Sequence, residues 1–146
     1  MNNIRVYFKK VHKNAITPSY SHPTDAACDL HVVEGFKIWP GERYLADTGL
    51  QVAIPEGFEG QIRPRSGQAW KRGLTVVNSP GTIDSSYRGN IKIALINLGD
   101  EPIDIEVAER VAQMKISSVY TGKFIESSDL DKTARGDGGF GSTGRV

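Results

Sequence analysis

The chain has 146 residues, enough for one domain with its own hydrophobic core. Its 18 basic and 17 acidic residues leave a net charge of +1 at pH 7, so no global field favours capture of nucleic acid or of an anionic membrane. A single cysteine excludes an internal disulfide, and no signal peptide or apolar membrane span is visible, so we expect a cytoplasmic protein.

Alternating apolar residues predict most of the secondary structure. In chain order the alternation runs through residues 44–54, 58–62, 91–95 and 103–107, and a further strand is expected at 30–33. Turn signals such as Pro40-Gly41 and Pro80-Gly81 separate these segments. Many short strands joined by turns predict a single all-β domain of the jelly-roll or barrel-like type.

Two further segments complete the expected organisation. A short helix is predicted at Gly67–Arg72, with Ser66 as its N-cap and Gly73 just past its end. The β-domain is expected to occupy residues 1–134, and residues 135–146 form a glycine-rich tail. Because the tail lacks an apolar pattern that would dock it, we expect it to be mobile in the free protein.

The first segment that carries chemistry is Asp25-Ala26-Ala27-Cys28-Asp29-Leu30, just before the strand predicted at 30–33. The carboxylate of Asp29 suits a water bound to magnesium, because this ion keeps several of its waters in proteins. Read alone, Asp29 equally fits an ordinary acid at the edge of a strand. The segment therefore offers an indirect metal contact as one of two interpretations.

The second segment, Pro64-Arg65-Ser66-Gly67, leads into the predicted helix. Free backbone N–H groups at a helix start bind phosphate, and Arg65 adds a charged fork of donors. Gly67 allows a ligand to approach the backbone closely. Read alone, the segment also fits a capped turn with a surface arginine. As a functional site it predicts phosphate binding.

The third segment runs from Asn78 to Gly89 and is polar and rich in turn residues. A β-hairpin here would present backbone donors and acceptors to the edge of a pyrimidine. Asp84 is a candidate general base for water, and Tyr87 is placed to pack against a sugar. Read alone, Asp84 also fits a residue that stabilises a turn, and Tyr87 a half-buried strand aromatic.

Gln113, in the segment Arg110-Val111-Ala112-Gln113-Met114, is the fourth candidate. Its amide would orient a water or contact a phosphate. Read alone, a single glutamine on a strand is more often structural or solvent-facing. The three histidines lack metal-ligand spacing, and no Ser–His–Asp or Cys–His set is visible, so covalent catalysis is not expected.

The fifth segment covers residues 135–144 and resembles a loop that wraps phosphate. Its glycines free backbone N–H groups for an anion nest, Ser142 and Thr143 add hydroxyls, and Phe140 suits stacking on a base. It is not a Walker A loop, because no lysine precedes Ser142. The match of Arg135-Gly136-Asp137 to the integrin-binding tripeptide is attributed to chance. Read alone, the whole segment also fits a flexible tail without a function.

Together and in this order, the five segments resemble the motifs of the trimeric dUTPase family, from about residue 24 to residue 144. The resemblance implies hydrolysis of dUTP to dUMP and pyrophosphate, with Mg²⁺ as the cofactor and Asp29 acting on it through water. It implies that Asp84 activates the attacking water, that Gln113 helps to place it, and that Tyr87 stacks on the deoxyribose.

The remaining substrate contacts that the resemblance implies fall into three groups. Those at uracil are Asn78 and the backbone groups of Thr82, Ile83 and Lys92. Those at the phosphates are Arg65, Ser66 and Gly67. Those in the tail are Arg135, Phe140, Gly141, Ser142 and Thr143.

The resemblance also implies a homotrimer whose active sites are shared, with the tail of a third subunit closing each one. Neither nucleic acid nor a membrane is expected as a partner. Two positions depart from the family pattern: Ala27 stands where glycine is usual, and Ser86 where a second acid is frequent. The base assignment rests on Asp84, the first acid of that motif, which is present.

Two other functions remain open. A dCTP deaminase has a related fold, but it needs a catalytic glutamate, and none lies beside Arg65 or Asp84. A nucleotide-sensing protein would bind dUTP and use the tail as a switch. The presence of Asp84, Gln113 and the tail argues against a protein that binds without catalysis.

Overall fold

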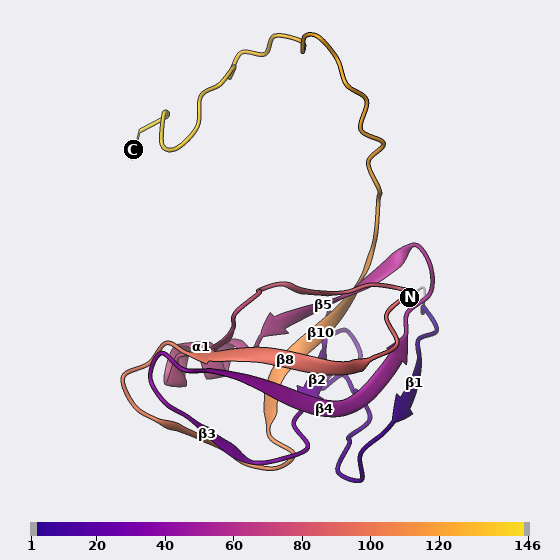
Figure 1. Cartoon of the computed structure of the whole chain (residues 1–146), viewed down its shortest axis with the longest axis vertical. Coiled ribbons are helices and arrows are strands. Elements are labelled where there is room, and N and C mark those ends of the chain that lie inside the picture. The colour runs from indigo at the N-terminus through magenta and orange to yellow at the C-terminus, as the bar shows by residue number, and fades with distance from the viewer. Residues whose placement is uncertain (1–2, 145–146) are drawn as a thin grey trace.

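The computed structural model describes residues 3–144 and confirms the all-β prediction (Figure 1). Two four-stranded sheets and a two-stranded ribbon account for its strands, and all the strand pairs are antiparallel. The elements within the described residues are β1 (Tyr7–Lys10), β2 (Cys28–His31), β3 (Phe36–Ile38), β4 (Arg43–Ala53), β5 (Phe58–Pro64), α1 (Ser66–Arg72), β6 (Leu74–Val76), β7 (Gly81–Ile83), β8 (Asn90–Asn97), β9 (Ile103–Ile105) and β10 (Arg110–Ser118).

The order of the strands is that of a jelly-roll-like sandwich. The first sheet has the order β1-β4-β8-β6, the second β2-β10-β5-β7, and β3 pairs with β9 in the ribbon. From β4 to β8, each successive strand lies in the other sheet. The connections therefore cross between the layers, and they bring β6 and β7 to an edge of each sheet.

The core is formed by the alternation that the sequence displays. β4 buries Ala46, Thr48, Leu50 and Val52, and β8 buries Ile91, Ile93 and Leu95. Each fully buried aliphatic side chain contributes roughly 1.5–3 kcal/mol. The buried hydroxyl of Thr48 donates a hydrogen bond to the Ile91 carbonyl at 2.7 Å, which satisfies a polar group in the core.

Three local expectations need correction. The strand expected at 30–33 runs from Cys28 to His31 instead, and the strand at 103–107 ends at Ile105, which leaves Val107 half exposed. The segment after Asn78 does not form a hairpin: β7 pairs with β5 in the second sheet, whereas β8 lies in the first. Local alternation and turn signals do not encode which distant strand is the partner.

Helix α1 begins one residue earlier than expected. Arg65 is the N-cap, with the extended angles φ −89° and ψ 132°, and no side chain caps the helix. Ser66 is therefore helical rather than the cap, because the chain stays extended through the end of β5. The end of the helix is as predicted: Gly73 has φ 72°, and a Cβ there would lie 2.3 Å from the Gly99 nitrogen.

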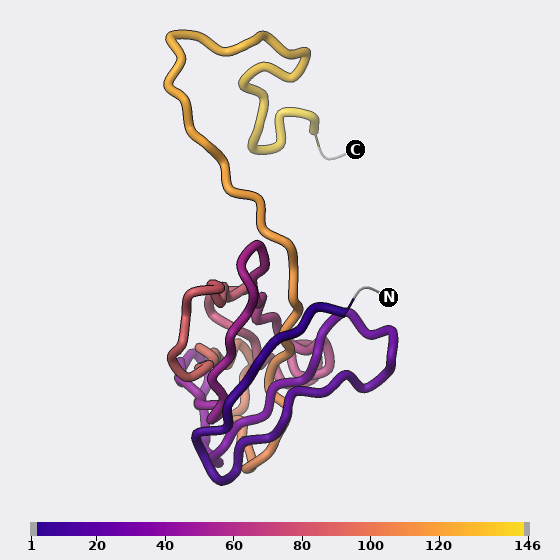
Figure 2. Tube along the Cα trace, turned by 90° about the vertical axis from the view of Figure 1, so that its right-hand side faces the viewer, coloured from indigo at the N-terminus to yellow at the C-terminus, as the bar shows by residue number. Residues whose placement is uncertain are grey.

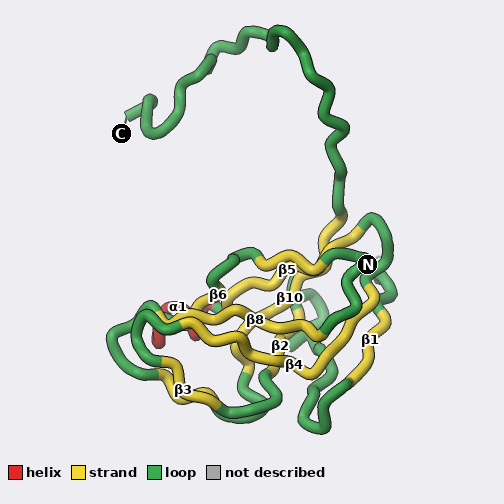
Figure 3. Tube along the Cα trace, viewed as in Figure 1, coloured by secondary structure: helices red, strands yellow, loops and turns green. Residues whose placement is uncertain are grey.

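After β10 the chain leaves the sandwich (Figure 2). Residues 119–144 contain neither helix nor strand, as Figure 3 shows, and their side-chain hydrogen bonds join residues within this segment. The division at 134/135 and the mobility of the tail remain predictions, and Arg145 and Val146 lie outside the described residues. None of the helical structure within residues 3–144 is long and apolar enough to cross a membrane.

Candidate active site

The first functional surface is a hollow between the edges of the two sheets, which we call the edge hollow. Its walls come from both layers, because residues 77–89 cross from β6 to β8 by way of β7. It brings together the residues outside the tail that were expected at the base and the sugar. The lining residues are Ile62, Val76, Asn78, Gly81, Thr82, Ile83, Asp84, Tyr87, Asn90, Lys92 and Ala94.

Two residues of the edge hollow supply its chemistry. The Asp84 side chain is exposed, and its carboxylate makes no side-chain hydrogen bond within the described part of the chain, so it is free to accept one from water. A turn holds Tyr87 beside it, in which the Tyr87 nitrogen donates to the Asp84 carbonyl at 3.1 Å. The arrangement suits a general base next to a flat aromatic surface.

The position of Tyr87 is fixed from two sides. Its hydroxyl donates to the Asn90 carbonyl at 2.9 Å, and a Cβ on Gly89 would lie 2.4 Å from the Tyr87 hydroxyl oxygen. The Asn90 amide is held by Gln51 at 3.0 Å and by Asp47 at 3.1 Å. Sequence reasoning missed Asn90, since its anchors lie on β4, about 40 residues earlier in the chain.

The second functional surface lies on the outer face of the second sheet, and we call it the basic hollow. Asp29, Gln113 and Arg63 are cross-strand neighbours on β2, β10 and β5 and share this face. The start of α1 closes one side. The lining residues are Ser21, Asp25, Ala26, Ala27, Asp29, Arg63, Arg65, Ser66, Gly67, Gln113 and Lys115.

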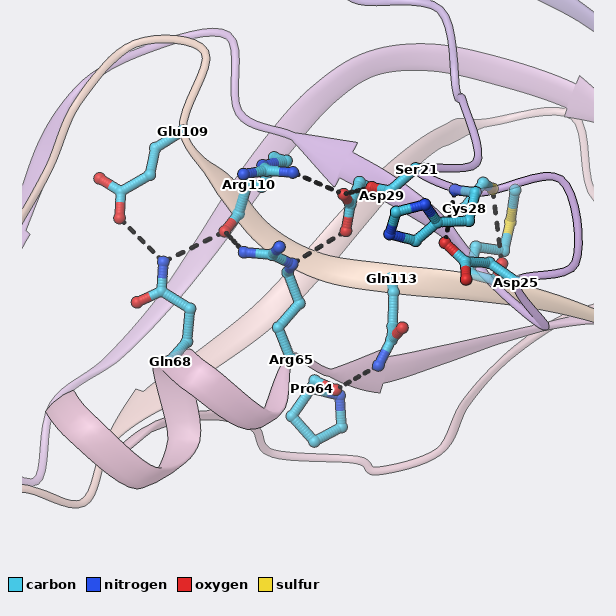
Figure 4. Close-up of polar contacts among 12 residues, drawn as sticks. Ser21, Asp25, Cys28, Asp29, Pro64, Arg65, Gln68, Glu109, Arg110 and Gln113 are labelled. Atoms are coloured by element: carbon cyan, nitrogen blue, oxygen red, sulfur yellow. Dashed lines mark hydrogen bonds and ion pairs between the residues drawn. The ribbon is translucent and has the colours of Figure 1, made fainter.

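Asp29 binds the two arginines that flank it (Figure 4). The Arg65 Nε donates to its Oδ1 at 2.9 Å, and the Arg110 Nη1 donates to its Oδ2 at 3.1 Å. The Ser21 hydroxyl also donates to Oδ2, at 3.3 Å. The Asp29 side chain is 13% exposed, so these charge-assisted bonds fix the direction of Arg65.

The other groups of the basic hollow remain open to a ligand. The Gln113 Nε2 donates to the Pro64 carbonyl at 2.9 Å, which leaves its amide oxygen as an acceptor (Figure 4). Ser66 and Gly67 are exposed, and a Cβ on Gly67 would meet nothing within 4 Å. The backbone donors at the helix start therefore belong to exposed residues that a ligand can approach, as anion binding requires.

Arg63 and Lys115 line this surface and Arg110 contacts its Asp29, although the sequence interpretation gave the three residues no role. A signal for the first two exists: Arg63 and Arg65, like Gln113 and Lys115, are two residues apart, and such residues share a face of a strand. Arg110 gave no comparable signal, since its partner Asp29 is 81 residues away. Ala27 lines the hollow, whereas Ser86 is exposed and lines neither hollow.

The charge of the basic hollow comes from arginine and lysine rather than histidine. Burial lowers the pKa of His31, which neighbours this surface on β2; the Asp29 carboxylate raises that pKa, and Arg110 and Arg65 lower it further. The imidazole is therefore neutral at physiological pH. Positive potential at this surface does not depend on its protonation.

The two hollows are distinct in one chain. Cys28, Met114 and Ile62 are cross-strand neighbours that are buried in the sandwich, whereas the adjacent row of Asp29, Gln113 and Arg63 points outward. Ile62 lines the edge hollow and Arg63 the basic hollow, and successive side chains of a strand point to opposite faces. Asp84 is thus not brought to Arg65 and Gln113 within one chain, and the described tail residues line neither hollow.

Within residues 3–144, no group of three or more His, Cys, Asp or Glu side chains could hold a metal ion by itself. Magnesium in phosphate-binding proteins keeps several waters and binds one or two carboxylates together with the substrate phosphates. Asp29 fits that arrangement, because its Oδ1 accepts one hydrogen bond from Arg65 and retains a lone pair for a metal-bound water.

A polar cleft with a carboxylate and a tyrosine, together with a basic surface at an open helix start, defines a β-sandwich protein that binds a phosphorylated small molecule. The model of the dUTPase family matches residues 13–144. The chain therefore belongs to the dUTPase family, as its motifs predicted.

Individual proteins of this family give the same result. A deoxyuridine 5'-triphosphate nucleotidohydrolase of Wolinella succinogenes is 48% identical over 145 residues, which cover 99% of this chain and 97% of the relative. The dUTPase of Staphylococcus bacteriophage 80alpha, solved with dUPNHPP, has a TM-score of 0.90 and 28% identity and covers 97% of this chain and 99% of its own.

A mutant dUTPase from phage phi11 of Staphylococcus aureus, whose structure reveals the coordination of a structural Mg(II) ion, has a TM-score of 0.81. Its sequence is 24% identical, and the match covers 86% of this chain and 98% of the phage protein. This similarity shows a shared fold.

Proposed function

We propose that this chain hydrolyses dUTP to dUMP and pyrophosphate. The observation that carries the proposal is the exposed carboxylate of Asp84 in the edge hollow, beside the fixed ring of Tyr87. Backbone groups of Thr82, Ile83 and Lys92, with Asn78, supply the polar edge that reads uracil. The Tyr87 ring covers the deoxyribose and leaves no room for a 2′-hydroxyl.

The reaction is an in-line displacement at the α-phosphorus. The Asp84 carboxylate accepts a proton from water, the water oxygen bonds to the α-phosphorus, and the bond from that phosphorus to the bridging oxygen breaks to release pyrophosphate. Gln113 orients the water through its free amide oxygen. Arg65 and the N–H groups at Ser66 and Gly67 hold the phosphate chain and stabilise its developing charge.

Mg²⁺ is the proposed cofactor. When bound to the triphosphate it supplies positive charge and holds the phosphate oxygens in one geometry. Asp29 is the residue that would contact it, through a bound water, while the same carboxylate orients Arg65. Removal of the metal by a chelator should abolish turnover of dUTP, and its return should restore it.

The complete site is proposed to form between subunits of a homotrimer. Ile62 of the edge hollow and Arg63 of the basic hollow point to opposite faces of β5, so we infer that a complete site combines the edge hollow of one subunit with the basic hollow of its neighbour. The tail of a third subunit, with Arg135, Phe140, Gly141, Ser142 and Thr143, would close over the substrate and exclude water. The cytoplasmic location is also a proposal, which cell fractionation would test.

A nucleotide panel tests the proposed function. The protein is incubated with dUTP, UTP, dTTP and dCTP, with and without magnesium, and the products are separated. We expect pyrophosphate and dUMP from dUTP alone, and loss of turnover without magnesium. A uracil product from dCTP would favour a deaminase, and binding of dUTP without release of pyrophosphate would favour a nucleotide sensor.

A further inference from the structure

Helix α1 is attached to the sandwich by a set of polar contacts, which we call the α1 clamp: Gln68, Arg72 and Glu109. The Gln68 Nε2 donates to the Glu109 Oε1 at 3.0 Å, and the Arg72 Nη1 donates to the Gln68 Oε1 at 3.1 Å. Arg72 also forms an ion pair with Glu109. The three side chains thus close a ring of hydrogen bonds between α1 and the start of β10.

The clamp is connected on both sides to the backbone. The Arg72 Nη2 donates to the Asp104 carbonyl at 2.6 Å, and the Glu106 nitrogen donates to the Glu109 Oε2 at 3.0 Å. The first contact lies on β9, and the second lies on the segment between β9 and β10. The clamp therefore joins α1 to backbone atoms of the sandwich and not only to other side chains.

The clamp also reaches the phosphate-binding arginine (Figure 4). The carbonyl of Arg110 accepts a hydrogen bond from Gln68 at 3.1 Å and a longer one from Arg65, at 3.5 Å. Gln68 and Arg65 are thus held by the same carbonyl. A shift of Gln68 would move the start of α1 away from β10 and from the arginine that Asp29 orients.

Few other contacts hold this helix. None of its seven residues is fully buried, and no side chain caps its start. A helix of this length is unstable by itself, and its position must come from tertiary contacts. Its fixed end is Gly73, which is at the opposite end from Ser66 and Gly67.

We propose that Gln68, Arg72 and Glu109 are positioning residues, which hold the start of α1 and Arg65 in register for the phosphate chain of the substrate. The inference rests on the proposed function and deepens it. The clamp touches no lining residue of the edge hollow in the described structure, so it acts on the phosphates and not on the base. A purely structural role would instead affect every ligand through the stability of the fold.

The test compares two ligands on variants of the clamp. In Gln68→Met the side chain keeps its length but loses its hydrogen bonds, and Arg72→Lys keeps the charge with a milder change of geometry. Lys37→Met is the matched control, because it removes the surface ion pair with Asp104 on the neighbouring ribbon. Dissociation constants for dUMP and for the imido analogue dUPNHPP are measured by calorimetry, with thermal melting alongside.

We expect the affinity for the triphosphate analogue to fall about 10-fold in Gln68→Met and less in Arg72→Lys, with the affinity for dUMP changed less than about 2-fold. The KM for dUTP should rise while kcat changes less, and Lys37→Met should resemble the wild type. An equal loss for both ligands, or no loss in either clamp variant, overturns the inference. If the wild type itself does not hydrolyse dUTP, it is the proposed function that fails.

Discussion

The edge hollow and the basic hollow differ in what builds them. The edge hollow is lined by residues on and between the strands β5 to β8, with Tyr87 fixed against Gly89 and Asn90. The basic hollow contains long charged side chains, and one of them, Arg65, is held by a largely enclosed ion pair with Asp29. The proposed recognition of the base thus depends on the fold, and the proposed recognition of the phosphates depends on a few side-chain contacts.

This contrast predicts that substitutions in the two hollows have different effects on activity and affinity. Removing a side-chain function in the edge hollow should affect chemistry or discrimination with little change in phosphate affinity.

The largest effect is expected from Asp84→Asn, which retains the shape of the edge hollow but removes the proton acceptor. The variant should bind dUTP and hydrolyse it at least about 100-fold more slowly, because a general base contributes a factor of this size. Pyrophosphate release and calorimetric affinity measure the two quantities separately. Near-normal turnover would rule out Asp84 as the base.

Deletion of residues 135–146 should come next. These residues make few contacts with the sandwich in the described chain, so the melting temperature should change little. Loss of closure should lower kcat by about 10-fold or more, since the triphosphate is less well aligned. An unchanged kcat would mean that the tail takes no part in catalysis.

Gly89→Ala should weaken discrimination rather than turnover. The added methyl would collide with the Tyr87 ring, which must then shift away from the sugar. We expect the preference for dUTP over UTP, measured as the ratio of kcat/KM, to fall by roughly 3–10-fold. Gly122→Ala, at a glycine without a positive φ and with neighbours only at ordinary van der Waals distance, controls for a general effect of losing a glycine. An unaltered ratio would show that the Tyr87 position does not set sugar selectivity.

The smallest effect concerns stability at acid pH and the α1 clamp. Burial alone would raise the pKa of Glu109, but bonds from the Glu106 nitrogen, Gln68 and Arg72 outweigh it and hold the pKa below the usual 4.5. A carboxylate with a lowered folded-state pKa stabilises the protein above its unfolded pKa, and the stabilisation is lost as pH falls through the folded value.

The free energy of unfolding should therefore decrease between about pH 5 and pH 3, and this decrease should be smaller in Glu109→Gln, by less than about 1 kcal/mol. Urea titrations at a series of pH values measure it. Identical pH profiles would show that the Glu109 contacts add no pH-dependent stability.

Local sequence signals were sufficient for most of the core, and the site residues expected outside the tail line one of the two hollows, although their roles remain predictions. The alternation in residues 44–54 and 91–95 predicts β4 and β8, because a strand half buried in a sandwich requires period two. The same information failed for the hairpin after Asn78, since β7 finds its partner β5 across the fold. Contacts such as Asp29–Arg110 join residues far apart in sequence, so local sequence signals could not predict them and only the folded sheet shows them.

In the proposed trimer, catalysis joins the edge hollow of one subunit to the basic hollow of another. The most direct test is to co-express Asp84→Asn with Arg65→Met, each inactive when expressed alone, and to measure dUTP hydrolysis by the mixed assemblies. Random assembly should restore about a quarter of wild-type activity, since some sites then combine an intact edge hollow with an intact basic hollow. Activity no higher than that of either variant alone would show that the site is not divided between subunits in this way.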